Sequence, residues 1–205
     1  AMIIGTAGFT AMLCVQALAD QHITPERGEI LVTGASGGVG SVAITLLNKL
    51  GYRVAAVTGR PEQNGDLLRS LGATRIIERA ELAQPAKPLE STRWAGAVDT
   101  VGSQILAKVL AQTEYDGAVA ACGLAGGMDL PTTVMPFILR NVKLIGVDSV
   151  YCPYEKRVAA WQKVAELLPE SYYAAASNEI ALEAVPEAAA QIIRGEITGR
   201  TLVQL

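Results

Sequence analysis

Residues 32–43 read Val-Thr-Gly-Ala-Ser-Gly-Gly-Val-Gly-Ser-Val-Ala, and they join two apolar segments through a glycine-rich turn. The apolar run 30–33 precedes this turn, and an apolar stretch that ends near Leu50 follows it. A buried strand, a tight turn and a helix in this order place the pyrophosphate of a nucleotide over the helix N-terminus. The segment therefore predicts a nucleotide-binding strand–turn–helix unit.

The glycine spacing is G-x-x-G-x-x-G with one further glycine at position 38, rather than the commoner G-x-G-x-x-G. Gly34 lets the chain leave the strand sharply, and Gly40 lets the helix pack close to the strand. Gly37 and Gly38 leave the backbone open to a phosphate, and Ser36 adds a hydroxyl donor. The alternative is that these glycines serve only the turn. Four glycines in seven residues between a strand and a helix favour nucleotide binding.

Composition limits the classes of protein that the chain fits. Its 205 residues are 50% hydrophobic and 5% aromatic, as expected for strands covered by helices on both faces. The net charge is −3 and there is no basic block, which argues against a nucleic-acid partner. Residues 1–18 lack a basic flank and are too short and interrupted to span a membrane.

The cysteines and the single histidine lack metal-ligand spacing. The three cysteines lie at positions 14, 122 and 152, and the histidine lies at position 22. This spacing argues against a structural zinc. An odd and sparse set of cysteines is typical of a reducing compartment, so we expect a cytoplasmic protein with no bound metal.

Strand and helix patterns alternate along most of the chain. After the glycine-rich turn we expect strands at 53–57, 75–77, 95–99, 118–121 and 143–148, and helices at 64–71, 105–111, within 131–140 and at 153–168. This alternation predicts an α/β Rossmann fold, with a doubly wound parallel sheet of six strands.

The end of the second strand indicates which dinucleotide is preferred. An acid there would bind the ribose 2′-hydroxyl of NAD. Here the strand ends in Thr58-Gly59-Arg60, whose donors and positive charge suit the 2′-phosphate of NADP. Arg79, which follows the third strand, is either a surface residue or a second cation for this phosphate. Glu62 is the one nearby acid that would favour NAD instead.

Two residues at later strand ends carry reactive groups. Asp99 ends the fourth strand, where a carboxylate more often caps the next turn than acts in catalysis. Cys122 follows the fifth strand, close to the expected ligand crevice, but no base is adjacent in sequence. We interpret Cys122 as a packing residue and predict no catalytic residue.

The two ends of the chain do not belong to the alternating pattern. Residues 5–19 form a helical stretch that is apolar on both faces, so we expect it to be buried. At the other end we expect a short strand at 178–182, a helix at 185–194 and an apolar strand at 200–205. The sheet is complete at its sixth strand. We therefore divide the chain into a nucleotide-binding domain at 1–177 and a separate C-terminal segment at 178–205.

Six segments together match a known pattern. They are Gly5-Thr-Ala-Gly-Phe-Thr-Ala11, Val32-Thr-Gly-Ala-Ser-Gly-Gly-Val-Gly40, Thr58-Gly-Arg60, Ala120-Ala-Cys-Gly-Leu-Ala-Gly-Gly127, Pro136-Phe-Ile-Leu-Arg140 and Leu144-Ile-Gly-Val-Asp-Ser-Val150. On these segments the chain resembles the medium-chain dehydrogenase/reductase superfamily. Within it, the chain is most similar to the zinc-free quinone-oxidoreductase branch, of the acryloyl-CoA reductase type.

The resemblance implies an NADPH-dependent reductase of activated alkenes, such as acryloyl-CoA, a related enoyl thioester or a quinone. It implies phosphate contacts from Ser36, Gly37, Gly38 and Val39. It implies 2′-phosphate contacts from Thr58, Gly59 and Arg60, with Arg79 nearby. For the nicotinamide half it implies Leu124, Ile138 and Ser149.

The resemblance also implies an N-terminal GroES-like domain, which this sequence does not contain. On that basis the chain is the cofactor-binding part of such an enzyme, and both terminal segments normally pack on the other domain. Without it we expect the first helix and the last strand to be exposed, disordered or paired with another copy. We also expect a homodimer formed through the sixth strand at 143–147, whose edge has no neighbour.

Two other functions share the glycine-rich turn. One is a non-catalytic NADPH-binding module or sensor. The other is an alcohol dehydrogenase, against which the lack of a Cys/His metal set argues, although zinc ligands would lie in the N-terminal domain.

Overall fold

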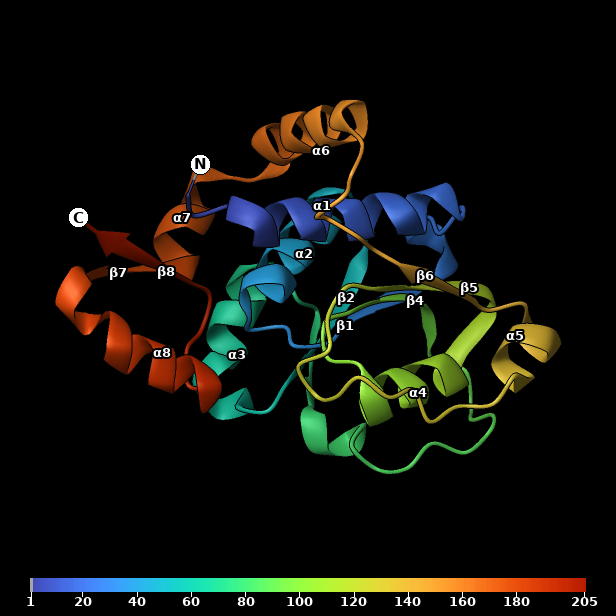
Figure 1. Cartoon of the computed structure of the whole chain (residues 1–205). Helices are drawn as coiled ribbons and strands as arrows, with labels where there is room; N and C mark the ends of the chain where they lie inside the picture. The colour runs from blue at the N-terminus through green and yellow to red at the C-terminus, as the bar shows by residue number, and fades with distance from the viewer. Residues whose placement is uncertain (1) are drawn as a thin grey trace.

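Six parallel strands form the central sheet of the computed structural model, which describes residues 2–205 (Figure 1). Their order is β3-β2-β1-β4-β5-β6, as predicted for a doubly wound Rossmann sheet. The strands are β1 (Glu29–Val32), β2 (Arg53–Thr58), β3 (Arg75–Glu78), β4 (Trp94–Asp99), β5 (Thr113–Ala121) and β6 (Lys143–Gly146). The chain order reverses between β1 and β4, so a ligand crevice is expected at their carboxyl ends.

Helices cover both faces of this sheet (Figure 1). One face carries α1 (Gly5–Asp20), α2 (Gly38–Lys49), α3 (Pro61–Ser70), α6 (Tyr154–Leu167) and α7 (Glu170–Ala176). The other face carries α4 (Ser103–Gln112) and α5 (Met135–Arg140). Successive side chains of β1 point to opposite faces of the sheet. Ile30 and Val32 belong to the hydrophobic cluster on the first face, and Leu31 belongs to the cluster on the second. Short 3-10 turns occupy Pro25–Arg27, Arg79–Glu81 and Leu182–Ala184.

Other elements of the same chain cover helix α1. It packs against α2, α6 and β5, and α6 lies across its outer side (Figure 1). The Phe9 ring stacks on Trp161 of α6, with ring centroids 6.2 Å apart and an interplanar angle of 3°. The expectation that α1 needs a further domain or a second copy is therefore wrong. The apolar periodicity of residues 5–19 shows burial, but it does not identify a covering helix that lies some 150 residues later.

The C-terminal segment forms a small unit beside the main sheet. Strands β7 (Ser177–Ala181) and β8 (Arg200–Gln204) form a parallel pair, and helix α8 (Val185–Ile193) connects them. Helix α8 has no buried residue. The last strand is ordered by its pairing with β7, so the expected disorder is wrong. Val203 and Leu205 are exposed, in agreement with the other expectation for this strand. Arg200 Nε also donates to the carbonyl oxygen of Ile3 at 2.9 Å. Among the helices of residues 2–205, none has the length and apolar character needed to cross a bilayer.

Candidate functional site

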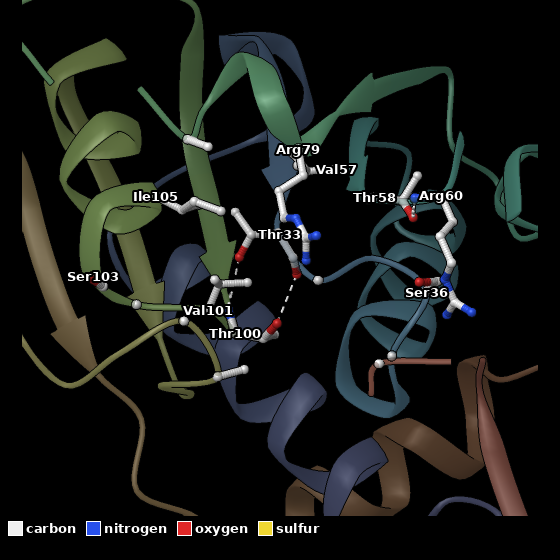
Figure 2. Close-up of a pocket in the computed structure, with 18 of the residues that line it drawn as sticks. Thr33, Ser36, Val57, Thr58, Arg60, Arg79, Thr100, Val101, Ser103 and Ile105 are labelled. Atoms are coloured by element: carbon white, nitrogen blue, oxygen red, sulfur yellow. Dashed lines mark hydrogen bonds between the residues drawn. The ribbon is translucent and has the colours of Figure 1, made fainter. Parts of the chain in front are cut away.

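A cleft of about 680 Å³ opens at the carboxyl ends of β1, β2 and β4 (Figure 2). The lining comes from the glycine-rich turn, the end of β2, the residues that follow β3, the β4–α4 connection, residues 125–126 after β5 and a turn near the C-terminus. This is the crevice expected at the point where the strand order reverses. The lining residues that the argument uses are Thr33, Ser36, Gly37, Thr58, Gly59, Arg60, Arg79, Thr100, Arg194 and Ile197.

The glycine-rich turn has the geometry that its sequence predicts. Gly34 adopts a φ of +58°, which favours glycine. A Cβ added at Gly40 would lie 2.4 Å from the carbonyl oxygen of Gly34 and 2.7 Å from the Cα of Ala35. Helix α2 begins at Gly38, so its first N–H groups lack partners within the helix. These groups and the helix dipole favour an anion beside Ser36 and Gly37.

The ends of β2 and β3 bring Arg60 and Arg79, respectively, to the opposite wall. Both arginines line the cleft, and Figure 2 shows the side chain of Arg79 extending toward Thr33 and that of Arg60 lying beside Ser36. Arg79 packs directly over Gly59, where an added Cβ would lie 2.9 Å from the guanidinium carbon. The Thr58 hydroxyl accepts hydrogen bonds from Arg60 N at 3.2 Å and from Asn64 Nδ2 at 3.4 Å. Thr58 therefore orients the start of α3, while the arginines supply the positive charge.

Residues 194–199, here called the C-terminal turn, form a wall that the sequence did not indicate. Arg60 donates from Nη1 to the carbonyl oxygen of Glu196 at 2.6 Å. From Nη2 it donates to the carbonyl oxygen of Ile197 at 3.2 Å and to Thr198 Oγ1 at 3.3 Å. The Gly199 N–H donates to the carbonyl oxygen of Ser36 at 2.8 Å. The turn is thus attached to both the glycine-rich turn and the end of β2.

The charges on the C-terminal turn are largely satisfied by one another. Arg194 pairs with Glu196 at 2.9 Å and with Glu187 at 3.1 Å. The hydrogen bond from Arg194 lowers the pKa of the Glu196 carboxyl, so this group is ionised and paired at neutral pH. Of the three arginines that line the cleft, Arg194 is thus paired with carboxylates, whereas Arg60 donates to uncharged oxygens of the C-terminal turn and keeps its positive charge beside the cleft, as Arg79 does.

Asp99 lies behind the cleft and not in its lining. Its side chain is fully buried and accepts hydrogen bonds from Thr33 Oγ1 at 2.7 Å and from Gly102 N at 2.8 Å. Burial raises the pKa of this carboxyl, against the opposite effect of those hydrogen bonds. Thr100 Oγ1 donates to the carbonyl oxygen of Thr33 at 3.0 Å (Figure 2). The interpretation of Asp99 as a cap for the next turn is confirmed.

The remaining predicted residues are divided between a second cavity and the surface. Val39 and Ser149 line a cavity of about 820 Å³, together with Cys122, Trp161 and Arg200. Leu124 and Ile138 are 62% and 71% exposed, and they lie outside the linings of both cavities. The structure thus gathers Ser36, Gly37, Thr58, Gly59, Arg60 and Arg79 around one cleft and Val39 and Ser149 around the other, and it leaves Leu124 and Ile138 apart. Within residues 2–205, no three His, Cys, Asp or Glu side chains gather as metal ligands.

The chain is similar in sequence to known proteins. Residues 38–169 match the zinc-binding dehydrogenase family. The chain is 62% identical over 205 residues to the probable acrylyl-CoA reductase AcuI of Escherichia coli strain K12, covering 100% of this chain and 63% of that protein. It is 53% identical over 206 residues to the acrylyl-CoA reductase AcuI of Ruegeria pomeroyi, covering 100% of this chain and 62% of that protein.

A solved structure is similar throughout the chain. The yhdH oxidoreductase from Salmonella enterica, crystallised in complex with NADP, is 61% identical and superposes with a TM-score of 0.96. The match covers 100% of this chain and 62% of that one. The chain therefore spans somewhat less than two thirds of the length of these relatives.

Proposed function

The chain belongs to the zinc-binding dehydrogenase family, and we propose that it is the cofactor-binding part of an NADPH-dependent reductase of activated alkenes. The observation that carries this proposal is the cleft in which Arg60 and Arg79 face the N-terminus of α2. Similarity to acrylyl-CoA reductases and to an NADP-bound oxidoreductase supports it. The proposed substrate is an electron-poor alkene, namely acryloyl-CoA, a related enoyl thioester or a quinone.

The cleft fits a dinucleotide that carries a 2′-phosphate. Ser36, Gly37, Gly38 and Val39 would hold the pyrophosphate, because the N–H groups at the start of α2 are directed outward there. Thr58, Gly59, Arg60 and Arg79 would hold the 2′-phosphate. The bare surface of Gly59 lets the Arg79 guanidinium lie flat against the backbone. No acid ends β2 to select a ribose hydroxyl instead.

The chain contributes placement more than acid–base chemistry. When bound, NADPH supplies the hydride that reduces the carbon–carbon double bond. The cleft would fix the adenosine half, and Leu124, Ile138 and Ser149 would lie near the nicotinamide half. Fixing one half of a long ligand limits the positions open to the other half, which favours a reactive geometry. We assign no residue of this chain as proton donor and no residue as zinc ligand.

Calorimetric titration with NADPH and, separately, with NADH tests this proposal. We expect NADPH to bind at least about tenfold more tightly, because a charge-assisted contact contributes about 1.5–3 kcal/mol. Equal affinities would contradict the assignment of Arg60 and Arg79 to the 2′-phosphate. Reduction of acryloyl-CoA by a longer protein that contains this chain would separate the reductase from a non-catalytic NADPH-binding module.

The proposal also includes two contacts with protein outside this chain, namely a substrate-binding domain and a second copy. Residues 178–205 would touch a substrate-binding domain, which the greater length of the relatives and the exposed Ile192 and Ile193 of α8 support. A second copy would pair along β6, which has β5 as its one neighbour in the sheet. Sedimentation equilibrium at high micromolar concentration should detect a dimer of the chain, and a pure monomer would contradict the β6 contact. We place the protein in the reducing cytoplasm.

A further inference from the structure

A third cavity, of about 310 Å³, lies between helices α1 and α6 and shares no lining residue with the two cavities described above. The part of α1 that lines it consists of Met12, Val15, Gln16 and Ala19. Their spacing of i, i+3, i+4 and i+7 places them on one face of the helix. This face of α1 is thus directed into the cavity, whose volume lies within the range of about 300–1,000 Å³ that small-molecule sites have.

The floor of the third cavity is apolar. Met12, Val15 and Tyr52 all line it, and all three side chains are buried. The Tyr52 hydroxyl donates to the carbonyl oxygen of Ile23 at 2.6 Å, so this polar group already has its partner. A methionine sulfur and a tyrosine ring both make favourable contacts with aromatic rings. The floor therefore suits an aromatic group.

One polar atom of the lining has no partner. The Oε1 atom of Gln16 is buried and accepts no hydrogen bond from any group of residues 2–205. A buried acceptor without a donor destabilises the fold, and such atoms are rare in native structures. Because Gln16 lies on the helix face that lines the cavity, a donor placed in the cavity can reach it. The site thus requires one hydrogen-bond donor in largely apolar surroundings.

The rim of the third cavity carries one charge of each sign. Lys163 and Glu166, from the C-terminal end of α6, are exposed, and so are Ala19 and Leu50 on the other sides of the opening. The two charges are exposed to water and opposite in sign, so a charged ligand gains no net attraction from them. An uncharged ligand is therefore favoured.

We propose that the third cavity binds a small neutral aromatic alcohol. The ring would lie on the floor formed by Met12, Val15 and Tyr52, and the hydroxyl group would donate to Gln16 Oε1. No residue of the proposed cofactor cleft takes part. The inference therefore goes beyond the proposed function, and either can fail without the other.

2-Naphthol and naphthalene are suitable probes, because they differ by the one hydroxyl group. Titration of the 205-residue chain, followed by the fluorescence of each probe, should show saturable one-to-one binding of both. In Gln16→Leu, 2-naphthol should bind about fivefold more weakly, while naphthalene should bind at least as tightly as before. Equal changes for the two probes would contradict the contact with Gln16. If neither probe binds saturably to the unchanged chain, the proposal is overturned.

Two further variants locate the probe on the molecule. Ala19→Phe places a large side chain at the exposed rim and should abolish binding of both probes. Ala159→Phe, at an exposed position of α6 outside the lining, is the matched control and should change neither affinity. Circular dichroism establishes that each variant is folded, and Ala19→Phe provides the test if Gln16→Leu is not. Unchanged binding in Ala19→Phe would overturn the proposal.

Competition with the cofactor separates this site from the cleft. Saturating NADP⁺ should leave the affinity for 2-naphthol unchanged, since no residue lines both sites. Displacement of 2-naphthol by NADP⁺ would place the probe in the cofactor cleft and overturn the proposal.

Discussion

The two ends of the proposed cofactor site differ in how far the chain surrounds them. At the adenosine end, several segments from distant parts of the sequence meet, and Arg60 makes three hydrogen bonds to the C-terminal turn. At the nicotinamide end, Leu124 and Ile138 are 62% and 71% exposed. Charge-assisted contacts strengthen where water is excluded, and exposed apolar side chains contribute little until something covers them. We call the adenosine end the closed end and the nicotinamide end the open end. On the proposed binding mode, the closed end would select the cofactor, and the open end is where substrate and further protein would add contacts.

The largest effect on stability and NADPH binding is expected from a substitution in the glycine-rich turn, which forms part of the closed end. In Gly40→Ala the new Cβ would lie 2.4 Å from a backbone oxygen, so the turn must move. We expect destabilisation by about 1–3 kcal/mol and NADPH binding weaker on the order of 100-fold. Titration calorimetry and urea unfolding measure the two effects. Gly146→Ala is the matched control and should change neither, because the added Cβ would meet no atom of residues 2–205 within 4 Å apart from its two chain neighbours.

Arg60→Asp should act on one cofactor far more than on the other. It removes a cation from the 2′-phosphate position and places a carboxylate there, so NADPH affinity should fall on the order of 30-fold. NADH affinity should stay within about threefold. Arg53→Asp, an exposed residue at the opposite end of β2, is the control for net charge. Equal losses for NADPH and NADH would show that Arg60 acts only by holding the C-terminal turn.

Thr198→Val tests whether the C-terminal turn positions Arg60. Thr198 accepts from Arg60 and donates to Asn64 Oδ1 at 3.0 Å. Losing these bonds should weaken NADPH about fivefold and NADH less. Thr201→Val is the control, because Thr201 Oγ1 is buried without a hydrogen-bond partner among residues 2–205. If the two variants bind NADPH equally, the turn does not organise the phosphate end.

The closed end could be predicted only where its residues are close in sequence. The glycine spacing and the Thr58-Gly59-Arg60 strand end predict their own wall, because strand, turn and helix are local features. Arg79 was left undecided between surface and site, and its packing over Gly59 depends on the alignment of β2 with β3. The C-terminal turn reaches the cleft through contacts more than 130 positions apart. No local pattern shows such a contact.

The same limit explains the errors about the ends of the chain. Residues 5–19 and 200–205 were expected to need an outside partner, because an apolar pattern does not show which segment covers it. The structure covers the first with α6. It pairs the second with β7 but leaves Val203 and Leu205 exposed. By contrast, the interpretation of Cys122 as a packing residue agrees with the structure, in which its side chain packs against the first hydrophobic cluster.

The smallest effect should come from the open end. Ile138→Ser removes an apolar side chain that is already 71% exposed. With no second wall at this end, a nicotinamide ring that touches Ile138 at its edge would bury little of the exposed surface, so we expect NADPH affinity to change less than about twofold. Leu139→Ser, on the same helix and 51% exposed, is the matched control. A tenfold loss confined to Ile138→Ser would mean that the cofactor itself closes this end, and the contrast between the two ends would then hold only before binding.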